Sequence, residues 1–490
     1  MVAAAALHDP VPLTSVPLTS RPADELLGGL LKQQRAASLE AGPPSLEQRL
    51  EDLERLRRVL LENQENFAAA ISKDFGHRSR HETLISEIFV SLEGIKHMRR
   101  NLAEWMSPER RWVSMLFFPG RSQVVYQPVG VVGVIAPWNF PVQLALLPVA
   151  TALAAGNRVM LKPSEYTPAT SALLKEALGR AFPDDKVAVV LGGPEVGAAF
   201  SRLAFDHLLF TGSTSVGKKI MQAAAENLVP VTLELGGKSP FIVDDSFSME
   251  RAAGSLVTGK LTNAGQICIA PDYALVPEGR SDELVASLQR EVGRRYPTML
   301  NNPDYTSIVN HRHYERLRHL LSDAQQKGGR LVEVNPGGER FDDESKHKLP
   351  LTLVLNPTED MAVMQDEIFG PILPVVSYRT LDEAIGYVNA RPRPLALYLF
   401  SDDEQRQQRV LERTTSGGVC INETLLHVAQ EDLPFGGIGA SGMGAYHGRE
   451  GFLAMSHKKP VFHQARWNGT ALMKPPYGPR LERLLKFMLR

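Results

Sequence analysis

From about Gln123 onward, short apolar runs rich in β-branched residues alternate with helical segments, and this alternation restricts the fold more than any other feature of the chain. The first series contains VVGVIA (131–136), NRVMLK (157–162), KVAVVLG (186–192), HLLF (207–210), VTLEL (231–235) and PFIV (240–243). The second contains DYALVP (272–277), LTLVLN (351–356), ILPVVSY (372–378) and LALYLF (395–400), with helical segments at 281–295 and 311–327. Continuous apolar runs are typical of parallel strands covered on both faces. We therefore expect two α/β domains, joined near 232–240 and again near 420.

The region before residue 123 is predicted to be helical after an N-terminal tail. Residues 1–24 contain the pentapeptide VPLTS twice and have neither a helical nor a strand period, which predicts a flexible tail. Ser45 followed by Gln48 forms a capping box, and a helix is expected to start there. The next predicted helix carries one apolar face, formed by Ile85, Ile88, Phe89, Leu92, Ile95, Leu102 and Trp105.

The composition is that of a globular protein without a global charge. Its 490 residues include 54 Lys and Arg against 55 Asp and Glu, a formal net charge of −1, so no overall field favours nucleic acid or an anionic membrane. Residues 122–157 carry no charge, but Pro128, Pro137, Pro141 and Pro148 interrupt them, so we expect a buried strand, loop and helix and no membrane span. The two cysteines are too few for a disulfide framework, which favours a cytoplasmic location.

Residues 207–219 are expected to form a strand, a glycine loop and the start of a helix. Backbone N–H groups and the helix dipole favour anions there, so the loop is a candidate phosphate or dinucleotide site. It nearly matches GxxxxGK[ST], the loop of ATPases and kinases, but Lys219 stands where that motif needs a hydroxyl for Mg²⁺. We expect no metal site, and a plain turn between strand and helix is the alternative interpretation of the loop.

Cys268 is the candidate nucleophile. It lies between Ile267 and Ile269, which also suits a buried structural cysteine. The preceding small polar residues 263–266 and the following Pro271 favour a thiol at a loop or helix end, where its pKa can fall. Cys420 is predicted to lie inside a strand, and we assign it no chemistry.

Three other side chains could act on a bound carbonyl compound. Glu234 is a charge in an apolar strand that ends in two glycines, where burial would raise its pKa as a general base requires, although a solvated strand face would also explain it. Glu367 resembles it but is a weaker candidate. Asn139 lies in a loop between Pro137 and Pro141 and could donate a hydrogen bond to an oxyanion.

Seven motifs, in chain order, resemble those of the aldehyde dehydrogenase superfamily, and the match runs from about residue 45 to about residue 460. They are PWNFP (137–141), LKPSEYTP (161–168), FTGSTSVGK (210–218), LELGGKSP (233–240), GQICIAPDY (265–273), EIFGPILPV (367–375) and PFGGIGASGMGAYHGREGF (434–452). RPRPLALYLFS (391–401) and SGMGAYHG (441–448) are similar to its short, dimeric branch. Ile267 departs from the smaller Thr or Val of many relatives and should narrow the surroundings of the thiol.

The resemblance implies an α/β fold with a Rossmann-type cofactor domain, an α/β catalytic domain and a small β bridging or oligomerisation element. The implied cofactor-binding domain covers 25–107 and 129–232, and the catalytic domain covers 233–421. The bridging segments are 108–128 and 433–460, and 461–490 form a C-terminal tail. A homodimer is the implied assembly.

The resemblance also implies a covalent reaction. The Cys268 thiolate adds to the aldehyde, Asn139 and the Cys268 backbone N–H hold the oxyanion, hydride passes to nicotinamide, and Glu234 activates the water that hydrolyses the thioester. The division of the base role between Glu234 and Glu367 is less clear in the short branch. The implied cofactor-binding residues are Trp138, Lys162, Glu165, Gly212, Ser213, Thr214, Ser215, Val216, Gly217, Glu367 and Phe369.

The implied cofactor is NAD, with NADP also usable, because the Glu165 carboxylate would hold the adenosine ribose hydroxyls and repel a 2′-phosphate. The implied substrate is an aromatic aldehyde of the coniferyl type, which is oxidised to the acid, with long-chain aliphatic aldehydes as the alternative. A dehydrogenase that transfers the acyl group to coenzyme A is less favoured because Glu234 is present. A non-enzymatic scaffold is disfavoured by the intact set of Cys268, Asn139 and Glu234.

Overall fold

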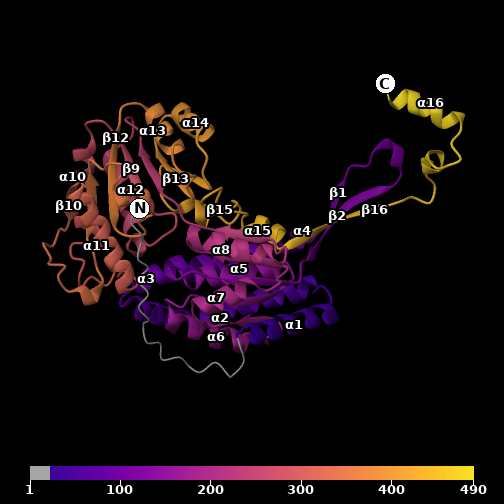
Figure 1. Ribbon diagram of the computed structural model, residues 1–490, viewed down its shortest axis with the longest axis horizontal. Helices are drawn as coiled ribbons and strands as arrows, with labels where there is room; N and C mark the ends of the chain where they lie inside the picture. Colours follow the sequence, from indigo (N-terminus) through magenta and orange to yellow (C-terminus); the bar gives the residue numbers. More distant parts are fainter. Residues whose placement is uncertain (1–22, 490) are drawn as a thin grey trace, which may run out of the picture.

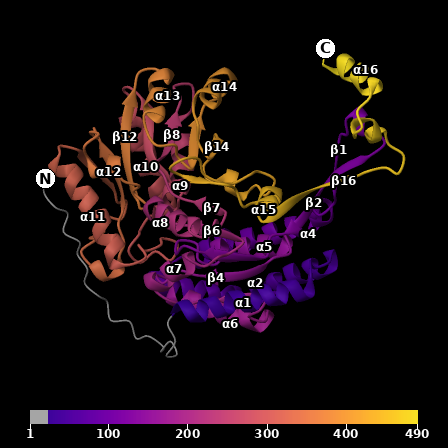
Figure 2. The ribbon, with the colours of Figure 1, turned by 45° about the vertical axis from the view of Figure 1, so that its right-hand side comes forward.

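A computed structural model describes residues 23–489 as a two-part body from which a narrow arm projects (Figure 1). Each part of the body is built on its own sheet, and a third, small sheet forms the arm. The arm and the C-terminal helix stand away from the body in both ribbon views (Figures 1 and 2). The predicted flexible tail lies largely outside the described residues, since helix α1 (Ala23–Ala41) begins at residue 23.

The first part of the body contains a six-stranded sheet in the order β15-β7-β6-β3-β4-β5. All its neighbouring strands run parallel except β15, which pairs antiparallel with β7. Its strands are β3 (Val131–Ile135), β4 (Arg158–Lys162), β5 (Val187–Val189), β6 (His207–Thr211), β7 (Val231–Glu234) and β15 (Gly442–Met443). Because the strands are parallel, the carboxyl ends of β3, β4, β6 and β7 share one edge of the sheet.

The second part contains a seven-stranded sheet in the order β10-β11-β12-β9-β8-β13-β14, parallel except for β10 against β11. Its strands are β8 (Ser239–Val243), β9 (Pro271–Pro277), β10 (Arg330–Val334), β11 (Leu351–Leu355), β12 (Ile372–Tyr378), β13 (Ala396–Phe400) and β14 (Gly418–Ile421). The chain passes from one sheet to the other through residues 235–238, directly after β7. Every apolar run named above forms a strand, and Cys420 lies within β14, as predicted.

Helices cover both sheets. The long N-terminal helix α2 (Leu46–Phe75) starts with the predicted Ser45–Gln48 capping box and packs against α5 (Gln143–Ala154) and α6 (Pro168–Ala181). Helix α5 is buried along its whole length, so the uncharged stretch forms a strand, a loop and a helix as expected. The other helices of the body are α3 (Arg80–Thr83), α4 (Val90–Trp105), α5 (Gln143–Ala154), α6 (Pro168–Ala181), α7 (Pro194–Ser201), α8 (Thr214–Ala225), α9 (Met249–Leu261), α10 (Ser281–Arg295), α11 (His311–Gln326), α12 (Ala362–Gln365), α13 (Leu381–Asn389), α14 (Glu404–Arg413) and α15 (Gly448–Ala454).

The predicted apolar face around α4 is wrong in part. Ile88, Ile95 and Leu102 are buried, but Ile85 and Phe89 are 63% and 58% exposed. A π-helical turn, η1 (Leu84–Phe89), precedes α4, and its wider turn changes the angle between successive side chains. A prediction that assumes a constant α-helical period therefore assigns all these residues to one face. In the structure, Ile85 and Phe89 in the π-helical turn lie on a different face from the buried residues after it.

The arm is an antiparallel sheet of β1 (Glu109–Arg111), β2 (Arg121–Pro128) and β16 (Ser456–His463), with β2 in the middle. No residue of β1 or β2 is fully buried, so the arm has almost no core of its own. The amphipathic helix α16 (Pro479–Met488) follows at its far end. Within residues 23–489, no helix is both long and apolar enough to cross a bilayer.

Candidate active site

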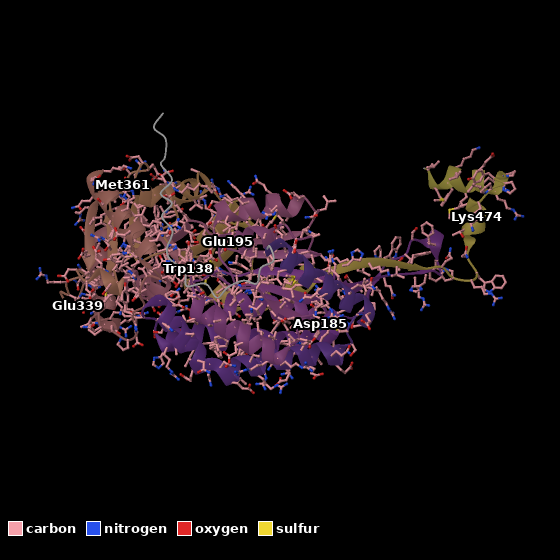
Figure 3. The ribbon with its side chains drawn as sticks, turned by 60° about the horizontal axis from the view of Figure 1, so that its bottom comes forward. Trp138, Asp185, Glu195, Glu339, Met361 and Lys474 are labelled. Atoms are coloured by element: carbon pink, nitrogen blue, oxygen red, sulfur yellow. The ribbon has the colours of Figure 1, made fainter. Side chains whose placement is uncertain are left out.

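The predicted site residues lie where the edges of the two sheets face each other. Asn139, Lys162, Ser213 and Glu234 lie at or directly after the carboxyl ends of β3, β4, β6 and β7, at one edge of the six-stranded sheet. Trp138, labelled in Figure 3, lies in the middle of the body. Ligands of open α/β sheets bind beyond this edge, where loops can present side chains and backbone N–H groups.

The second sheet contributes the opposite side of the cleft. Cys268 lies three residues before β9, and Glu367 and Phe369 lie shortly before β12, the neighbour of β9. The amino ends of these parallel strands share one edge, so the Cys268 and Glu367 loops lie side by side. An edge-to-face contact between Trp138 and Phe369, with ring centroids 5.3 Å apart, joins the two halves across the cleft.

Cys268 keeps part of its surface accessible, but its surroundings do not favour the thiolate. Burial, with the nearby carboxylates of Glu367 and Glu234, raises the pKa of Cys268 to about 12. The prediction that a loop position would lower this pKa is therefore wrong for the free protein, because burial, together with the two acidic groups, outweighs the backbone N–H groups near the sulfur.

The backbone before the thiol follows a conformation that side chains rarely adopt. Asn263 and Ala264 have φ values of 50° and 51°. The side-chain amide of Gln266 secures the turn by donating to Asn263 O and Ser307 O, while its oxygen accepts from the Val309 N–H. Three buried hydrogen bonds from one side chain thus hold a loop of unfavourable conformation.

Asn139 is buried, and its side-chain amide points at the nucleophile loop. Its Nδ2 donates to Gln266 O over 3.2 Å, two residues before Cys268. The amide is therefore close enough to the thiol loop to donate to an oxygen that forms on a carbon bound to the sulfur.

Glu234 is 2% exposed, and neither of its carboxylate oxygens has a hydrogen-bond partner among the described residues. Burial raises its pKa well above the usual range, as the sequence predicted. Ionising an unpartnered buried carboxyl costs free energy, so the surroundings of Glu234 favour its neutral form. Such a group is suited to exchanging a proton with a bound water molecule.

Glu367 directs its carboxylate at the turn between the sheets. A Cβ at Gly236 would overlap with this carboxylate, and the Gly237 backbone donates a hydrogen bond to it. Burial, followed by the charge of Asp272, raises the pKa of Glu367 to about 8. The sequence did not identify Arg316, whose guanidinium donates to Glu367 O over 3.1 Å and holds this loop.

Lys162 and Glu165 form an ion pair at the end of β4. The Lys162 Nζ lies 2.6 Å from Glu165 Oε2, and the lysine side chain is 4% exposed while the glutamate is 30% exposed. Beside them, Tyr166 and Trp138 both contact the ring of His313 from α11. His313 was not predicted, because it is far from the family motifs in the sequence.

The glycine loop fits a dinucleotide phosphate. Ser213 caps α8 by accepting from the Val216 N–H, and Ser213, Ser215 and Val216 are exposed, so the positive end of the helix is open. A Cβ at Gly217 would lie 2.6 Å from Leu235, so glycine lets the first turn of α8 approach the end of β7. These residues, with Lys162 and Glu165, suit a phosphate and a ribose respectively.

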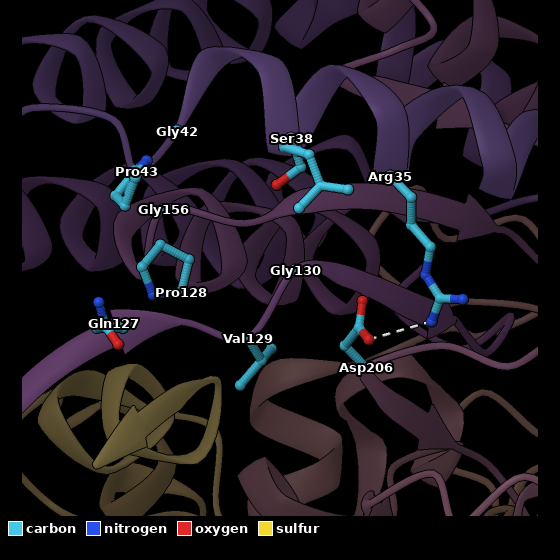
Figure 4. Close-up of a pocket in the computed structure, with 11 residues that line it drawn as sticks. Arg35, Ser38, Gly42, Pro43, Gln127, Pro128, Val129, Gly130, Gly156 and Asp206 are labelled. Carbon is cyan, nitrogen blue, oxygen red and sulfur yellow. Dashed lines mark hydrogen bonds and ion pairs between the residues drawn. The ribbon is translucent and has the colours of Figure 1, made fainter. Parts of the chain in front are cut away.

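A separate cavity of about 530 Å³ lies at the opposite edge of the same sheet (Figure 4). It is lined by Gly130, Gly156 and Asp206, which directly precede or lie near the amino ends of β3, β4 and β6. Arg35 of α1 pairs with Asp206 across it over 3.1 Å. The predicted site residues that follow strands of this sheet all lie at its other edge, and the remaining ones belong to the second sheet, so this cavity is not the candidate active site.

Comparisons with known proteins agree with the geometry. The model of the aldehyde dehydrogenase family matches residues 31–461. The chain is 54% identical to a "probable coniferyl aldehyde dehydrogenase" of Pseudomonas aeruginosa, covering 94% of this chain and 95% of that protein. It is 51% identical to the coniferyl aldehyde dehydrogenase of a Pseudomonas species, covering 95% and 96%.

A solved structure gives the same result for the fold. A substrate-bound AldH of Staphylococcus aureus superposes with a TM-score of 0.88 at 39% identity, covering 94% of this chain and 99% of that one. The family match extends over most of the chain, and the relatives are covered almost completely. This chain belongs to the aldehyde dehydrogenase family.

Proposed function

We propose that this protein oxidises an aromatic aldehyde of the coniferyl type to its carboxylic acid through a thioester on Cys268. The observation that carries the proposal is the convergence of Cys268, the Asn139 amide and the unpartnered carboxyl of Glu234 between the two sheet edges. The Pseudomonas relatives support the substrate class by their names and by identity over nearly the full chain.

In this proposal, the Cys268 thiol loses its proton to solvent water, and its Sγ bonds to the carbonyl carbon, whose oxygen becomes an oxyanion. The Asn139 amide and the Cys268 backbone N–H donate to that oxygen. Oxidation leaves an acyl group on the sulfur. Glu234, once ionised, takes a proton from water as the water oxygen bonds to the acyl carbon, and cleavage of the C–S bond releases the acid and restores the thiol.

The chain would hold a nicotinamide dinucleotide at the carboxyl edge of the six-stranded sheet, where its nicotinamide supplies the acceptor for the hydride. The proposed contacts are the helix start at Ser213 for the pyrophosphate, Lys162 and Glu165 for the adenosine ribose, and Glu367 for the nicotinamide ribose. The remaining proposed contacts are Trp138, Gly212, Thr214, Ser215, Val216, Gly217 and Phe369. NAD is the proposed preference, with NADP also used, because the Glu165 carboxylate would repel a 2′-phosphate.

Glu234 is the proposed main base, since neither of its oxygens has a hydrogen-bond partner within residues 23–489, while the Glu367 carboxylate is held at the Gly236–Gly237 turn. The domain roles are likewise proposals: 25–107 and 129–232 for the cofactor, 233–421 for catalysis, and 108–128 and 433–460 for bridging. The cytoplasmic location stays a prediction.

We also propose a homodimer that uses the arm. Residues 108–128 and 456–490 contain 11 basic and 2 acidic residues, whereas the rest of the chain contains 43 basic and 53 acidic residues. The nearly neutral chain is thus divided into a basic arm and tail and an acidic remainder. Opposite charges favour contact of the arm of one copy with the body of another.

The proposed function is tested with coniferyl aldehyde, benzaldehyde and a series of aliphatic aldehydes, measuring NADH formation, with Cys268→Ala as the blank. We expect the highest kcat/KM for coniferyl aldehyde and release of the free acid. Higher kcat/KM for long aliphatic chains would replace the aromatic assignment. Product formation that depends on added coenzyme A would contradict hydrolysis by Glu234.

A further inference from the structure

A fully buried ion pair lies beneath the proposed oxyanion site. Arg78, which follows α2, and Glu87, in the π-helical turn η1, have no exposed side-chain surface. Arg78 Nη1 lies 2.9 Å from Glu87 Oε1. Neither residue belongs to the motifs that mark the family, and the proposed reaction assigns them no role.

Both partners also bind the backbone of the Asn139 loop. Arg78 Nη1 donates to Asn139 O over 2.9 Å, and its guanidinium stacks on the ring of Phe140 at 4.8 Å. Glu87 Oε2 accepts from the Val142 and Gln143 N–H groups over 2.6 and 3.1 Å. The ion pair therefore holds this loop on both sides of the Phe140–Pro141 turn.

The same segment of the chain also binds the nucleophile loop. The carboxylate of Glu82, in α3, accepts from the Asn263 N–H over 3.1 Å and from Thr306 Oγ1 over 2.7 Å. Asn263 Nδ2 in turn donates to Asn139 O over 3.1 Å. Asn139 O thus receives one donor from the buried pair and one from the Cys268 loop.

Stability alone does not account for this arrangement. Burying two charged side chains costs hydration free energy that a well-packed apolar pair would not lose. In addition, Arg78 Nε and Nη2 have no hydrogen-bond partner among residues 23–489, so part of this cost is not recovered. An oxyanion donor, by contrast, must be held within fractions of an ångström of its acceptor. The directional hydrogen bonds of the Arg78–Glu87 pair to the loop backbone meet this need for accurate positioning.

We propose that Arg78 and Glu87 are positioning residues that orient the Asn139 amide toward the oxygen bound at Cys268. The inference rests on the proposed role of Asn139. Loss of one oxyanion donor lowers kcat by about 10²–10³-fold. A substitution at Arg78 or Glu87 would leave the Asn139 amide in place but less well oriented, so kcat should fall by less, about ten- to hundredfold.

The test is a double-mutant cycle of Arg78→Met, Asn139→Ala and the combined variant, with Arg78→Lys as the conservative control. We expect Arg78→Met to lower kcat while the dissociation constant for NAD and the rate of Cys268 alkylation by iodoacetamide change less than about twofold. The combined variant should be no slower than Asn139→Ala alone, and Arg78→Lys should recover part of kcat. If Arg78→Met does not fold, the isosteric Glu87→Gln replaces it in the same cycle.

Each contrary result identifies what has failed. Suppose that Asn139→Ala lowers kcat and that the fold decrease in the combined variant equals the product of the two single decreases. Arg78 then acts independently of Asn139, so the inference is overturned while the proposed function stands. Equal losses in kcat, NAD binding and thiol alkylation would show a general structural role for Arg78. Wild-type kcat in Asn139→Ala would overturn both the role of Asn139 and the inference.

Discussion

In the cleft between the sheets, charged side chains are buried and bound to backbone groups, whereas on the arm large apolar side chains are exposed. Arg78 and Glu87 have no exposed side-chain surface, but Trp112, Met115 and Trp467 are 82%, 89% and 82% exposed. Both regions reverse the usual distribution of polar and apolar groups, and each reversal costs free energy. The difference agrees with the proposed roles of the cleft in catalysis and of the arm in dimer formation, and under that proposal substitutions in one region should leave the property of the other unchanged.

The largest effect is expected for the thiol of the cleft. Cys268→Ala should lower kcat by roughly 10⁴-fold or more, because no covalent adduct can form, while NAD binding and assembly stay as in wild type. Cys420→Ala, in strand β14, is the matched control and should keep wild-type turnover. Steady-state assays of both variants measure kcat, and sedimentation measures their assembly. Full turnover by Cys268→Ala would exclude the covalent mechanism.

Glu234→Gln should lower steady-state turnover by about a hundredfold. Hydrolysis should slow more than acylation, so stopped-flow absorbance should show a burst of about one NADH per site. Equal loss of burst and steady state would instead assign Glu234 to thiol activation or to structure.

The same variant has a pH signature in its stability. Burial raises the pKa of folded Glu234 above its ordinary value of 4.5, so the stability from holding this proton is complete below pH 4.5 and is lost as pH rises through the folded pKa. Glutamine lacks this dependence. The stability of Glu234→Gln relative to wild type should therefore increase with pH in denaturant titrations.

On the arm, Trp112 and Phe118 are 82% and 71% exposed. Trp112→Ser combined with Phe118→Ser should weaken the proposed dimer at least about a hundredfold, since each aromatic side chain buried in the interface would contribute about 2 kcal/mol. Activity per site should stay within about twofold of wild type in the same samples. Sedimentation at several salt concentrations measures the association, which should weaken as salt screens the basic arm. An unchanged assembly would place the interface elsewhere, and loss of activity with intact dimers would break the separation between arm and cleft.

The smallest effect is expected at Glu165, at the rim of the cleft. Wild type should prefer NAD by roughly tenfold in kcat/KM, and Glu165→Gln should shift the ratio toward NADP by removing the charge opposite a 2′-phosphate. Both cofactors are compared at one saturating aldehyde concentration. A ratio that does not change would mean that Glu165 faces away from the ribose.

The sequence predicted those parts of the fold whose local pattern is decisive. The apolar runs became buried parallel strands because only apolar side chains fit between two layers of helices. It did not predict β10, which is only partly buried, or α1, whose residues follow the repetitive tail. The faces around η1 were assigned wrongly because a π-helical turn has no signal in a constant period.

The same division holds for the site. Asn139, Glu234 and Cys268 could be proposed as site residues because they lie within motifs, and the structure brings their loops together. Arg78, Glu87 and Arg316 were missed because each acts through contacts distant in the sequence, such as Arg78 with Asn139 O. The pKa of Cys268 was predicted in the wrong direction because the thiol becomes buried, and is brought close to Glu367 and Glu234, only in the folded chain.

The high pKa of Cys268 also has a consequence for the lifetime of the protein. Because burial raises the pKa of Cys268 to about 12, the protonated thiol predominates at pH 7. Peroxides attack thiolates and convert them to sulfenic and then to irreversibly oxidised acids. The protonated Cys268 thiol of the free protein should therefore resist oxidation by peroxides. The sulfur becomes sensitive to oxidation only in those states in which it is deprotonated and can react with the aldehyde.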